Sequence, residues 1–222
     1  MRRNRLAALF TAPAFSCLLT SCGTSADTAA QHSVALVVKS TNTEFWLSVF
    51  AGAEAAAAEY NLILTTSGPG TEEDYEAQNR MIESAVEAGA EALVFSAIDY
   101  EKNAAAIDSA AQAGVQIVSI DSGVASGAVS TYIGTYNYAA GRMAAQAALE
   151  SVEGPLSVGI VNYDEGTANG QEREQGVRDA LEESGRARIG ASVTTLVEAG
   201  RAQSDAAALL SQELQDPRRG GG

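Results

Sequence analysis

The chain has 222 residues, of which 46% are apolar, 14 are basic and 28 are acidic. Three of the basic residues and none of the acidic ones lie in residues 1–21, so residues 22–222 carry a net charge of −17. That acidic surface repels nucleic acid and anionic lipid, which argues against a genome-binding role, and the chain is long enough for one sizeable core or two modest ones.

The amino terminus has the pattern of an export signal. A basic tip with Arg2, Arg3 and Arg5 precedes an apolar stretch over residues 6–19, which is too short to span a bilayer. The stretch ends in small residues before Cys22, and this ending resembles the lipobox of a bacterial lipoprotein signal. The resemblance implies a signal peptide over residues 1–21 and a lipid on Cys22. The alternative is a plain secretory signal whose cysteine is incidental.

After the small, polar linker of residues 22–33, apolar runs alternate with helical segments. Three helix–turn–strand units in a row indicate right-handed crossovers and a parallel sheet, which predicts a first lobe over residues 34–135. The stretch from Thr71 to Asp74 predicts a capping box with Asp in place of Glu, and Asp99 is predicted as the next N-cap. The predicted strands are 34–38, 62–64, 92–95, 115–120 and the short edge strand 131–136, and the predicted helices are 44–60, 71–88 and 99–114.

A second alternation follows, with helices over 137–152, 168–184 and 200–214 and strands over 156–161 and 188–196. It predicts the start of a second doubly wound lobe, residues 136–216, and two strands are too few to complete one. Residues 217–222 suit neither a strand nor a helix exit. They are a disordered tail or the result of a truncated or frame-shifted gene, and we expect the latter. The predicted fold class is α/β, with two doubly wound parallel-sheet lobes of which the second is incomplete.

Three segments near predicted strand ends carry a family resemblance. Residues 34–38 precede Asn42-Thr-Glu-Phe-Trp46, another buried strand ends in Asp121, and Gly170-Gln-Glu-Arg173 opens a helix. In that order, and together with the lipobox, they resemble the type I periplasmic binding proteins, in the ribose- and galactose-binding group that serves sugar ABC transporters. The resemblance covers about residues 34–215. It implies two lobes that close on a sugar and a closed form that docks on a membrane permease.

The resemblance also implies which side chains bind the ligand. Phe45 and Trp46 fall where the family places aromatic rings that cover the apolar faces of a sugar. Asp121 matches the carboxylate that accepts hydrogen bonds from sugar hydroxyl groups. Each has a structural alternative, because an aromatic residue at a helix start often packs into the sheet and an Asp at a strand end often caps a turn.

Other positions depart from the family pattern. Thr43 stands where the family often has Asn, and Ser122 stands where ribose binders have Arg. Gln171 aligns with the second-lobe Arg of ribose binders, so these changes argue against ribose itself as the ligand. In this interpretation Asn169, Gln171 or Arg173 supplies the missing donors, while Arg173 has the alternative of a salt bridge on an acidic helix.

Enzymes of several classes lack their required residues here. The sequence has no G-x-S-x-G elbow, no Walker loop and no metal-spaced His or Cys. His32 is the only His and lies in the linker, while Cys17 and Cys22 leave no disulfide or thiol nucleophile elsewhere. We therefore expect no catalytic residue, metal or cofactor. LacI-type repressors share the implied fold, but the lipobox stands where their helix-turn-helix would be.

Among binding proteins, the sequence leaves transport and sensing open. A sensor that presents a sugar, nucleoside or signalling furanone to a chemoreceptor or kinase is one alternative, and a non-functional receptor fragment is another. The leading hypothesis is a solute-binding lipoprotein held outside the cytoplasmic membrane by the lipid on Cys22, with a sugar as ligand and an ABC permease as partner. We expect a monomer by default.

Overall fold

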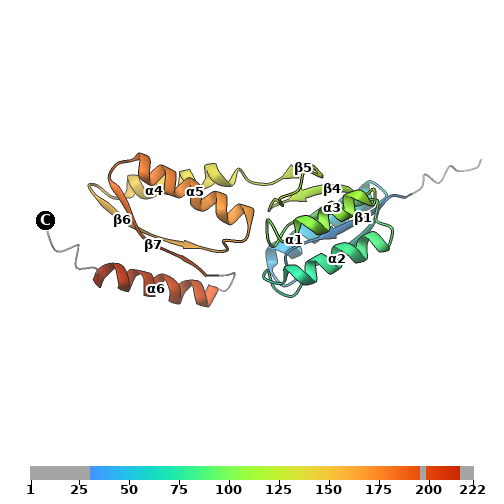
Figure 1. Cartoon of the computed structure of the whole chain (residues 1–222), viewed down its shortest axis with the longest axis horizontal. Helices are drawn as coiled ribbons and strands as arrows, with labels where there is room; N and C mark the ends of the chain where they lie inside the picture. The colour runs from blue at the N-terminus through green and yellow to red at the C-terminus, as the bar shows by residue number, and fades with distance from the viewer. Residues whose placement is uncertain (1–30, 196–198, 216–222) are drawn as a thin grey trace, which may run out of the picture. The chain divides into compact units, whose positions relative to one another are not determined.

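The computed structural model describes residues 31–195 and 199–215 (Figure 1). The predicted signal peptide, Cys22, the tail over 217–222 and most of the linker lie outside the described residues. Contacts place all of the described residues in one unit of the chain. No helix within those ranges has the length and apolar character needed to cross a membrane.

A sheet of five parallel strands forms the first lobe, in the order β2–β1–β3–β4–β5. Its strands are β1 (Ser33–Val37), β2 (Ile63–Ser67), β3 (Ala92–Phe95), β4 (Gln116–Ile120) and β5 (Val129–Ile133). The helices between the first four strands are α1 (Glu44–Glu59), α2 (Tyr75–Glu87) and α3 (Ala104–Gln112). The parallel sheet predicted from the alternation is therefore present.

The two faces of this sheet bury separate apolar clusters, as the period of two along a strand requires. On one face, Val37 of β1 packs in a cluster with Ile82 of α2 and Ile107 of α3. On the other face, Leu36 packs with Trp46 of α1. Because helices cover both faces, the strands read as continuous apolar runs.

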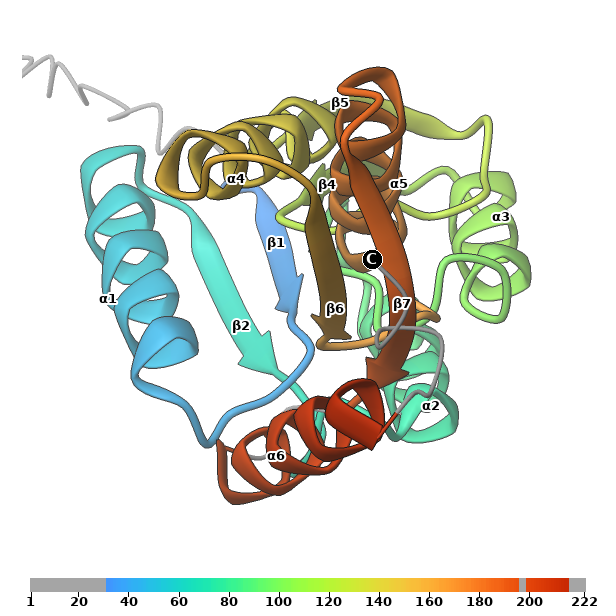
Figure 2. The ribbon, with the colours of Figure 1, turned by 90° about the vertical axis from the view of Figure 1, so that its left-hand side faces the viewer.

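A second sheet contains the parallel strands β6 (Leu156–Asn162) and β7 (Ala187–Thr194). It belongs to the second lobe, together with α4 (Asn137–Ser151), α5 (Ala168–Glu183) and α6 (Ala199–Gln215). Figure 2 shows α4 and α5 on one side of these strands and α6 on the other. The passage between the two sheets runs from β5 into α4.

Two predicted helix starts are wrong. The second helix begins at Tyr75, with Asp74 as its N-cap, because Asp74 Oδ1 accepts the Ala77 N–H at 2.8 Å. Thr71 lies in the turn before this helix and does not form the predicted capping box at its start. The third helix begins at Ala104, not at Asp99.

Asp99 does cap a turn that precedes that helix. Its Oδ1 accepts the N–H groups of Glu101 and Lys102 at 3.0 and 2.9 Å. Asp forms such local hydrogen bonds in turns as well as at helix starts. The residue type alone therefore does not tell whether Asp99 caps a turn or a helix. The second strand also extends to Ser67, beyond the predicted 62–64, and the edge strand ends at Ile133 instead of residue 136.

Candidate functional site

The loops after β1 and β4 meet the start of α5 at a pocket of about 340 Å³. Its volume lies in the range of small-molecule pockets, about 300–1,000 Å³. Both lobes line it, so we call it the interlobe pocket. Its lining residues are Lys39, Thr43, Phe45, Trp46, Glu72, Asp121, Tyr163, Asn169 and Arg173.

The start of α1 supplies the aromatic side of the pocket. Thr43 is the N-cap of this helix, and its hydroxyl accepts the Trp46 N–H at 3.4 Å. The rings of Phe45 and Trp46 meet edge to face with centroids 4.8 Å apart. Trp46 is 1% exposed and its indole N–H donates to Glu72 at 2.8 Å, whereas Phe45 is 57% exposed. Trp46 therefore belongs to the packed base, and Phe45 is the ring available to a ligand.

Asp121 follows β4 in a left-handed backbone conformation, with φ of 57°. Asp tolerates this region better than most residues, and non-glycine residues held there cluster at functional sites. Its Oδ2 accepts the Ser96 hydroxyl at 3.0 Å and lies 3.1 Å from Lys39 Nζ. Its backbone carbonyl accepts the Tyr132 hydroxyl at 2.7 Å. The carboxylate is thus held from the first lobe while its side chain stays partly exposed.

Lys39 follows β1 and is 1% exposed. Burial on its own lowers the pKa of this ammonium, but Tyr163, Asp121 and Glu72 outweigh that effect and raise it above the usual 10.5. The group is therefore a cation at neutral pH. Its Nζ donates to the Tyr163 hydroxyl at 2.8 Å, which is a contact between the lobes.

The second lobe contributes side chains from the β6–α5 loop and the first turns of α5. Thr167 caps α5, and the buried Asn169 donates to Asp121 Oδ1 at 3.4 Å. Arg173 lies one turn further along the helix, where its Nε donates to Asn137 Oδ1 at 2.9 Å. That bond orients the guanidinium and leaves its terminal nitrogens for other partners.

Six of the eight residues predicted to bind ligand line the interlobe pocket: Thr43, Phe45, Trp46, Asp121, Asn169 and Arg173. Ser122 and Gln171 do not. Ser122 is fully buried, and its hydroxyl has no hydrogen-bond partner among the described residues. Gln171 is exposed and donates to the backbone carbonyl of Glu165 at 2.7 Å.

Three lining residues escaped the sequence analysis: Lys39, Glu72 and Tyr163. Lys39 carried a usable signal, because it directly follows a buried parallel strand, as Asp121 does. Tyr163 follows β6 in the same way. Glu72 lies in the loop after β2, and its contact with Trp46 joins residues 26 positions apart. Nothing in the local pattern indicates that contact.

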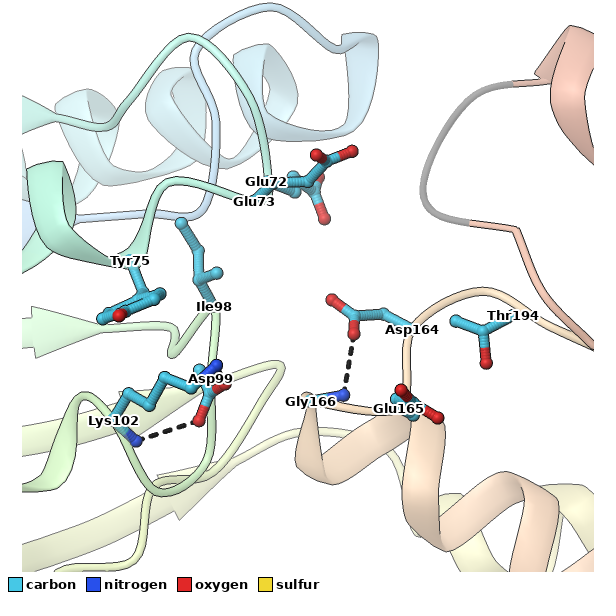
Figure 3. Close-up of a pocket in the computed structure, with 10 residues that line it drawn as sticks. All are labelled: Glu72, Glu73, Tyr75, Ile98, Asp99, Lys102, Asp164, Glu165, Gly166 and Thr194. Atoms are coloured by element: carbon cyan, nitrogen blue, oxygen red, sulfur yellow. Dashed lines mark hydrogen bonds and ion pairs between the residues drawn. The ribbon is translucent and has the colours of Figure 1, made fainter.

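A second hollow, of about 260 Å³, shares Glu72 with the interlobe pocket (Figure 3). Figure 3 shows Lys102 beside Asp99, with a distance of 3.0 Å between Nζ and Oδ2. The same ammonium lies 4.8 Å from the centre of the Tyr75 ring. Most other charged groups at this hollow are carboxylates, so its lining is acidic.

Asp164 is one of the partly buried acids of the second hollow. Burial raises its pKa, and the charges of Asp99 and Glu165 add to that effect, although the Gly166 N–H and Lys39 oppose it. The Gly166 N–H bonds to its Oδ1 at 2.7 Å (Figure 3). Over the described ranges, no group of three or more His, Cys, Asp and Glu residues is placed to hold a metal ion.

The sequence matches the family described as "Periplasmic binding protein domain" over residues 34–218. The D-ribose/D-allose-binding protein of Pseudomonas aeruginosa PAO1 is 27% identical over 190 residues, which make up 82% of this chain and 60% of that protein. The chain therefore spans less than two thirds of the length of that relative.

Solved structures of sugar transport proteins are also similar. A sugar transporter from Clostridium phytofermentans is 26% identical, with a TM-score of 0.75 over 82% of this chain and 68% of that chain. An ABC transporter solute-binding protein from Agrobacterium vitis, solved with bound D-fucose, is 25% identical, with a TM-score of 0.77 over 82% of this chain and 64% of that chain.

Proposed function

The chain belongs to the periplasmic binding protein domain family, and from this premise we propose that it captures a sugar or sugar-like polyol in the interlobe pocket. The observation that carries the proposal is the meeting of Phe45, Asp121 and Asn169 at one pocket. These residues come from three separate loops or helix starts. The names of the relatives, which refer to ribose, allose and fucose, support a sugar as the ligand class.

The chemistry of the pocket suits a neutral polyol. The exposed ring of Phe45 offers a flat apolar surface to the C–H face of a sugar. Asp121 and Glu72 offer carboxylate acceptors, while Lys39 and Arg173 offer charged donors. Hydroxyl groups both donate and accept, so a ring of them can use both kinds of partner through charge-assisted hydrogen bonds. The four charges cancel, which favours a ligand without net charge.

We propose that ligand binding draws the two lobes together and that the closed form delivers the sugar to an ABC permease. A ligand that contacts Phe45 and Asp121 from one lobe and Asn169 from the other is bound fully only when both lobes are in place. Closure then follows from contacts that only the closed state makes. The similarity to a sugar transporter and to an ABC transporter solute-binding protein supports this role.

Sugar binding can be measured directly because Trp46 is the only tryptophan in the chain and lies at the pocket. We expect D-ribose, D-allose or D-fucose to change its fluorescence in a saturable way, with a dissociation constant in the micromolar range. Calorimetry provides an independent measure. Asp121→Asn keeps the residue size and removes the charge, so it should weaken binding by roughly tenfold or more.

Lys102→Met serves as a control for that experiment, since it removes a charge from the second hollow and not from the interlobe pocket. Its affinity should equal that of the wild type. A folded protein that binds none of these sugars, nor related pentoses and hexoses, contradicts the proposed function.

We also propose that the protein is held outside the cytoplasmic membrane by a lipid on Cys22, with residues 22–33 as a tether. Support comes from the signal pattern before that residue. Cells that express the chain with labelled palmitate should yield labelled protein in the membrane fraction. Cys22→Ser should abolish the label and release the protein from membranes, while Cys17→Ser should do neither. Equal labelling of both variants counts against the anchor.

A further inference from the structure

Asn162 is a buried polar residue at the end of a strand that otherwise consists of apolar and small residues. Asn is depleted in strands. The Asn162 side chain does not line the interlobe pocket, but the next residue along the chain, Tyr163, does. Because Asn162 is only 9% exposed, its carboxamide must find hydrogen-bond partners within the protein. These partners therefore indicate what Asn162 does.

Asn162 joins the loop after β6 to α5 and to the end of β7. Its Oδ1 accepts the Tyr163 N–H at 2.8 Å, and its Nδ2 donates to the Gly170 carbonyl at 3.3 Å and to Glu174 Oε2 at 2.6 Å. Carbonyl and carboxylate oxygens only accept and a backbone N–H only donates, so these partners fix the orientation of the amide. The backbone carbonyl of Asn162 also accepts the Thr195 N–H at 2.9 Å.

Glu174 holds the Asn162 amide from the second turn of α5. While its Oε2 accepts from Asn162, its Oε1 accepts from Arg178 Nε at 2.8 Å and from the Ser192 hydroxyl at 3.1 Å. Hydrogen bonds to an ionised group are stronger than those between neutral groups. Because partners on α5 and β7 fix the carboxylate, it supports the Asn162 side chain rigidly.

The contacts of Asn162 lead to two side chains that line the interlobe pocket. Tyr163 is held through its backbone N–H, and Gly170 directly follows Asn169. The Gly170 N–H bonds to Asn169 Oδ1 at 3.0 Å, and the Tyr163 hydroxyl lies 3.5 Å from that same oxygen. The loop also packs tightly against the helix, since a Cβ atom at Gly170 would clash with the backbone carbonyl of Asp164. A shift of the loop would therefore displace Asn169 as well.

We propose that Asn162 is a positioning residue for the ligand site, which fixes Tyr163 and Asn169 relative to the end of β6 and is itself anchored by Glu174. All of these residues belong to the second lobe. The effect on ligand binding rests on the proposed function, because it presumes a sugar in this pocket. The hold on the loop and on α5 does not, and it can be measured without sugar.

Amide hydrogen exchange of the full chain without sugar tests the hold on α5. In Asn162→Ala the Tyr163 amide loses its acceptor directly. The amides of residues 169–171 should also exchange at least about fivefold faster than in the wild type, because the start of α5 is released. Amides of α2, in the first lobe, should not change. Wild-type exchange at residues 169–171 in Asn162→Ala overturns the proposal.

Asn103→Ala is the matched control for ligand affinity. Asn103 is also buried, its Oδ1 accepts the Asp99 N–H at 2.9 Å and its Nδ2 donates to Asn79 Oδ1 at 2.7 Å, but neither partner lines the interlobe pocket. Both variants should lose stability in urea unfolding. Only Asn162→Ala should weaken binding of the best sugar among D-ribose, D-allose and D-fucose, by roughly tenfold. An equal change of affinity in the two variants, or none in Asn162→Ala, overturns the positioning role.

A swap of amide and carboxylate tests the anchor. Asn162→Asp keeps the acceptor for the Tyr163 N–H but sets one carboxylate against another, so it should weaken sugar binding by roughly tenfold or more. Adding Glu174→Gln restores a donor opposite the new carboxylate and should recover affinity by roughly threefold or more. No recovery overturns the anchoring role of Glu174.

The outcomes of these experiments remain distinguishable. Should Asn162→Ala fail to fold, hydrogen exchange and affinity of Asn162→Asp, with and without Glu174→Gln, decide the question. If the wild type binds no sugar, the proposed function fails, and hydrogen exchange still decides whether Asn162 holds the loop and the start of α5.

Discussion

Asn169 and Gln171 differ in what they can offer a ligand, although they stand two positions apart in α5. Residues at this spacing point to different sides of a helix. Asn169 is 4% exposed and donates to Asp121, whereas Gln171 is exposed and donates to the backbone carbonyl of Glu165 in the loop before α5. We expect Asn169→Ala to weaken sugar binding by roughly tenfold and Gln171→Ala to change it by less than about twofold.

Calorimetric titration of both variants with the same sugar checks this expectation. Each variant should first show the wild-type circular dichroism spectrum. A larger loss in Gln171→Ala than in Asn169→Ala would favour Gln171 as the donor to the ligand and contradict the expectation drawn from the interlobe pocket.

Substitutions of Phe45 and Trp46 should have different effects, the first mainly on sugar binding and the second mainly on the stability of the fold. Trp46 is almost fully buried among apolar side chains, so Trp46→Ala should lower the free energy of unfolding by about 3–5 kcal/mol. Phe45 is mostly exposed, and Phe45→Ala should cost about 1 kcal/mol or less while weakening sugar binding. Urea unfolding followed by circular dichroism measures the first effect, and calorimetry the second. An equal loss of stability in Trp46→Ala and Phe45→Ala counts against the assignment of Trp46 to the core and of Phe45 to ligand contact.

The sequence predicted the polar residues that follow buried strands better than their partners. Asp121 could be found because the carboxyl ends of parallel strands meet at one edge of a sheet. Lys39 obeys the same rule, but a lysine at a strand end is usually a solvent-exposed residue, and only the fold shows it to be buried beside Tyr163 and Asp121. Gln171 was named because it aligns with a family arginine, and an alignment gives a position in the sequence but not on a helix face. The structure does not bring Gln171 to the interlobe pocket, and its contact with a ligand stays a prediction.

At the scale of elements, α4 and α5 approach so closely that glycine is required at the contact. A Cβ atom at Gly176 would clash with the backbone carbonyl of Tyr138, and one at Gly141 with that of Arg173. Gly176→Ala should therefore force the helices apart and lower the free energy of unfolding by about 1–3 kcal/mol. Thermal unfolding followed by circular dichroism measures this change.

Gly52 is the matched control for Gly176. It also lies inside a helix, but nothing lies within 4 Å of an added Cβ. Gly52→Ala should raise the free energy of unfolding by about 0.5–1 kcal/mol, since alanine loses less conformational freedom in a helix than glycine. A loss of stability in both variants would show that the helix contact is not the cause.

Most elements could be predicted because their patterns are strong and local. Buried parallel strands give unbroken apolar runs, and helices such as α5 start at a capping residue, here Thr167. The errors fell on the ends of β2 and β5 and on helix starts, where several candidates stand close together. Thr71 and Asp74 are both good caps by residue type, and the choice between them depends on where the chain leaves β2, which is a tertiary property.

At the scale of the whole molecule, stability should be lost at low pH partly through Glu174. Burial raises the pKa of this carboxyl, but hydrogen bonds from Arg178, Asn162 and Ser192 outweigh that and lower it below the usual 4.5. Its contribution is therefore present above about pH 4.5 and lost as pH falls through the folded pKa. The difference in free energy of unfolding between wild type and Glu174→Gln should shrink below that pH, as urea titrations at several pH values can measure.

Lys39 should act at the opposite end of the pH range. Its pKa in the folded protein lies above the usual 10.5, so its contribution is fully present below that value and lost as pH rises through the folded pKa. Between these two limits we expect neither group to change stability. A loss of the Lys39 contribution near neutral pH, seen as convergence of wild type and Lys39→Met, would show that the ammonium is not stabilised as described.

The contacts among Lys39, Asp121, Asn169 and Tyr163 have a consequence for how sharply the pocket discriminates between sugars. Where the polar groups of a pocket have no hydrogen-bond partner other than the ligand, a ligand that lacks one hydroxyl binds much more weakly. The buried group that this hydroxyl would contact is then left without a partner. Here Asn169 can still bond to Asp121 or Tyr163 when a hydroxyl is missing. Deoxy analogues and epimers that differ at this position should therefore compete with the preferred sugar, and the protein should be tolerant towards a set of related sugars.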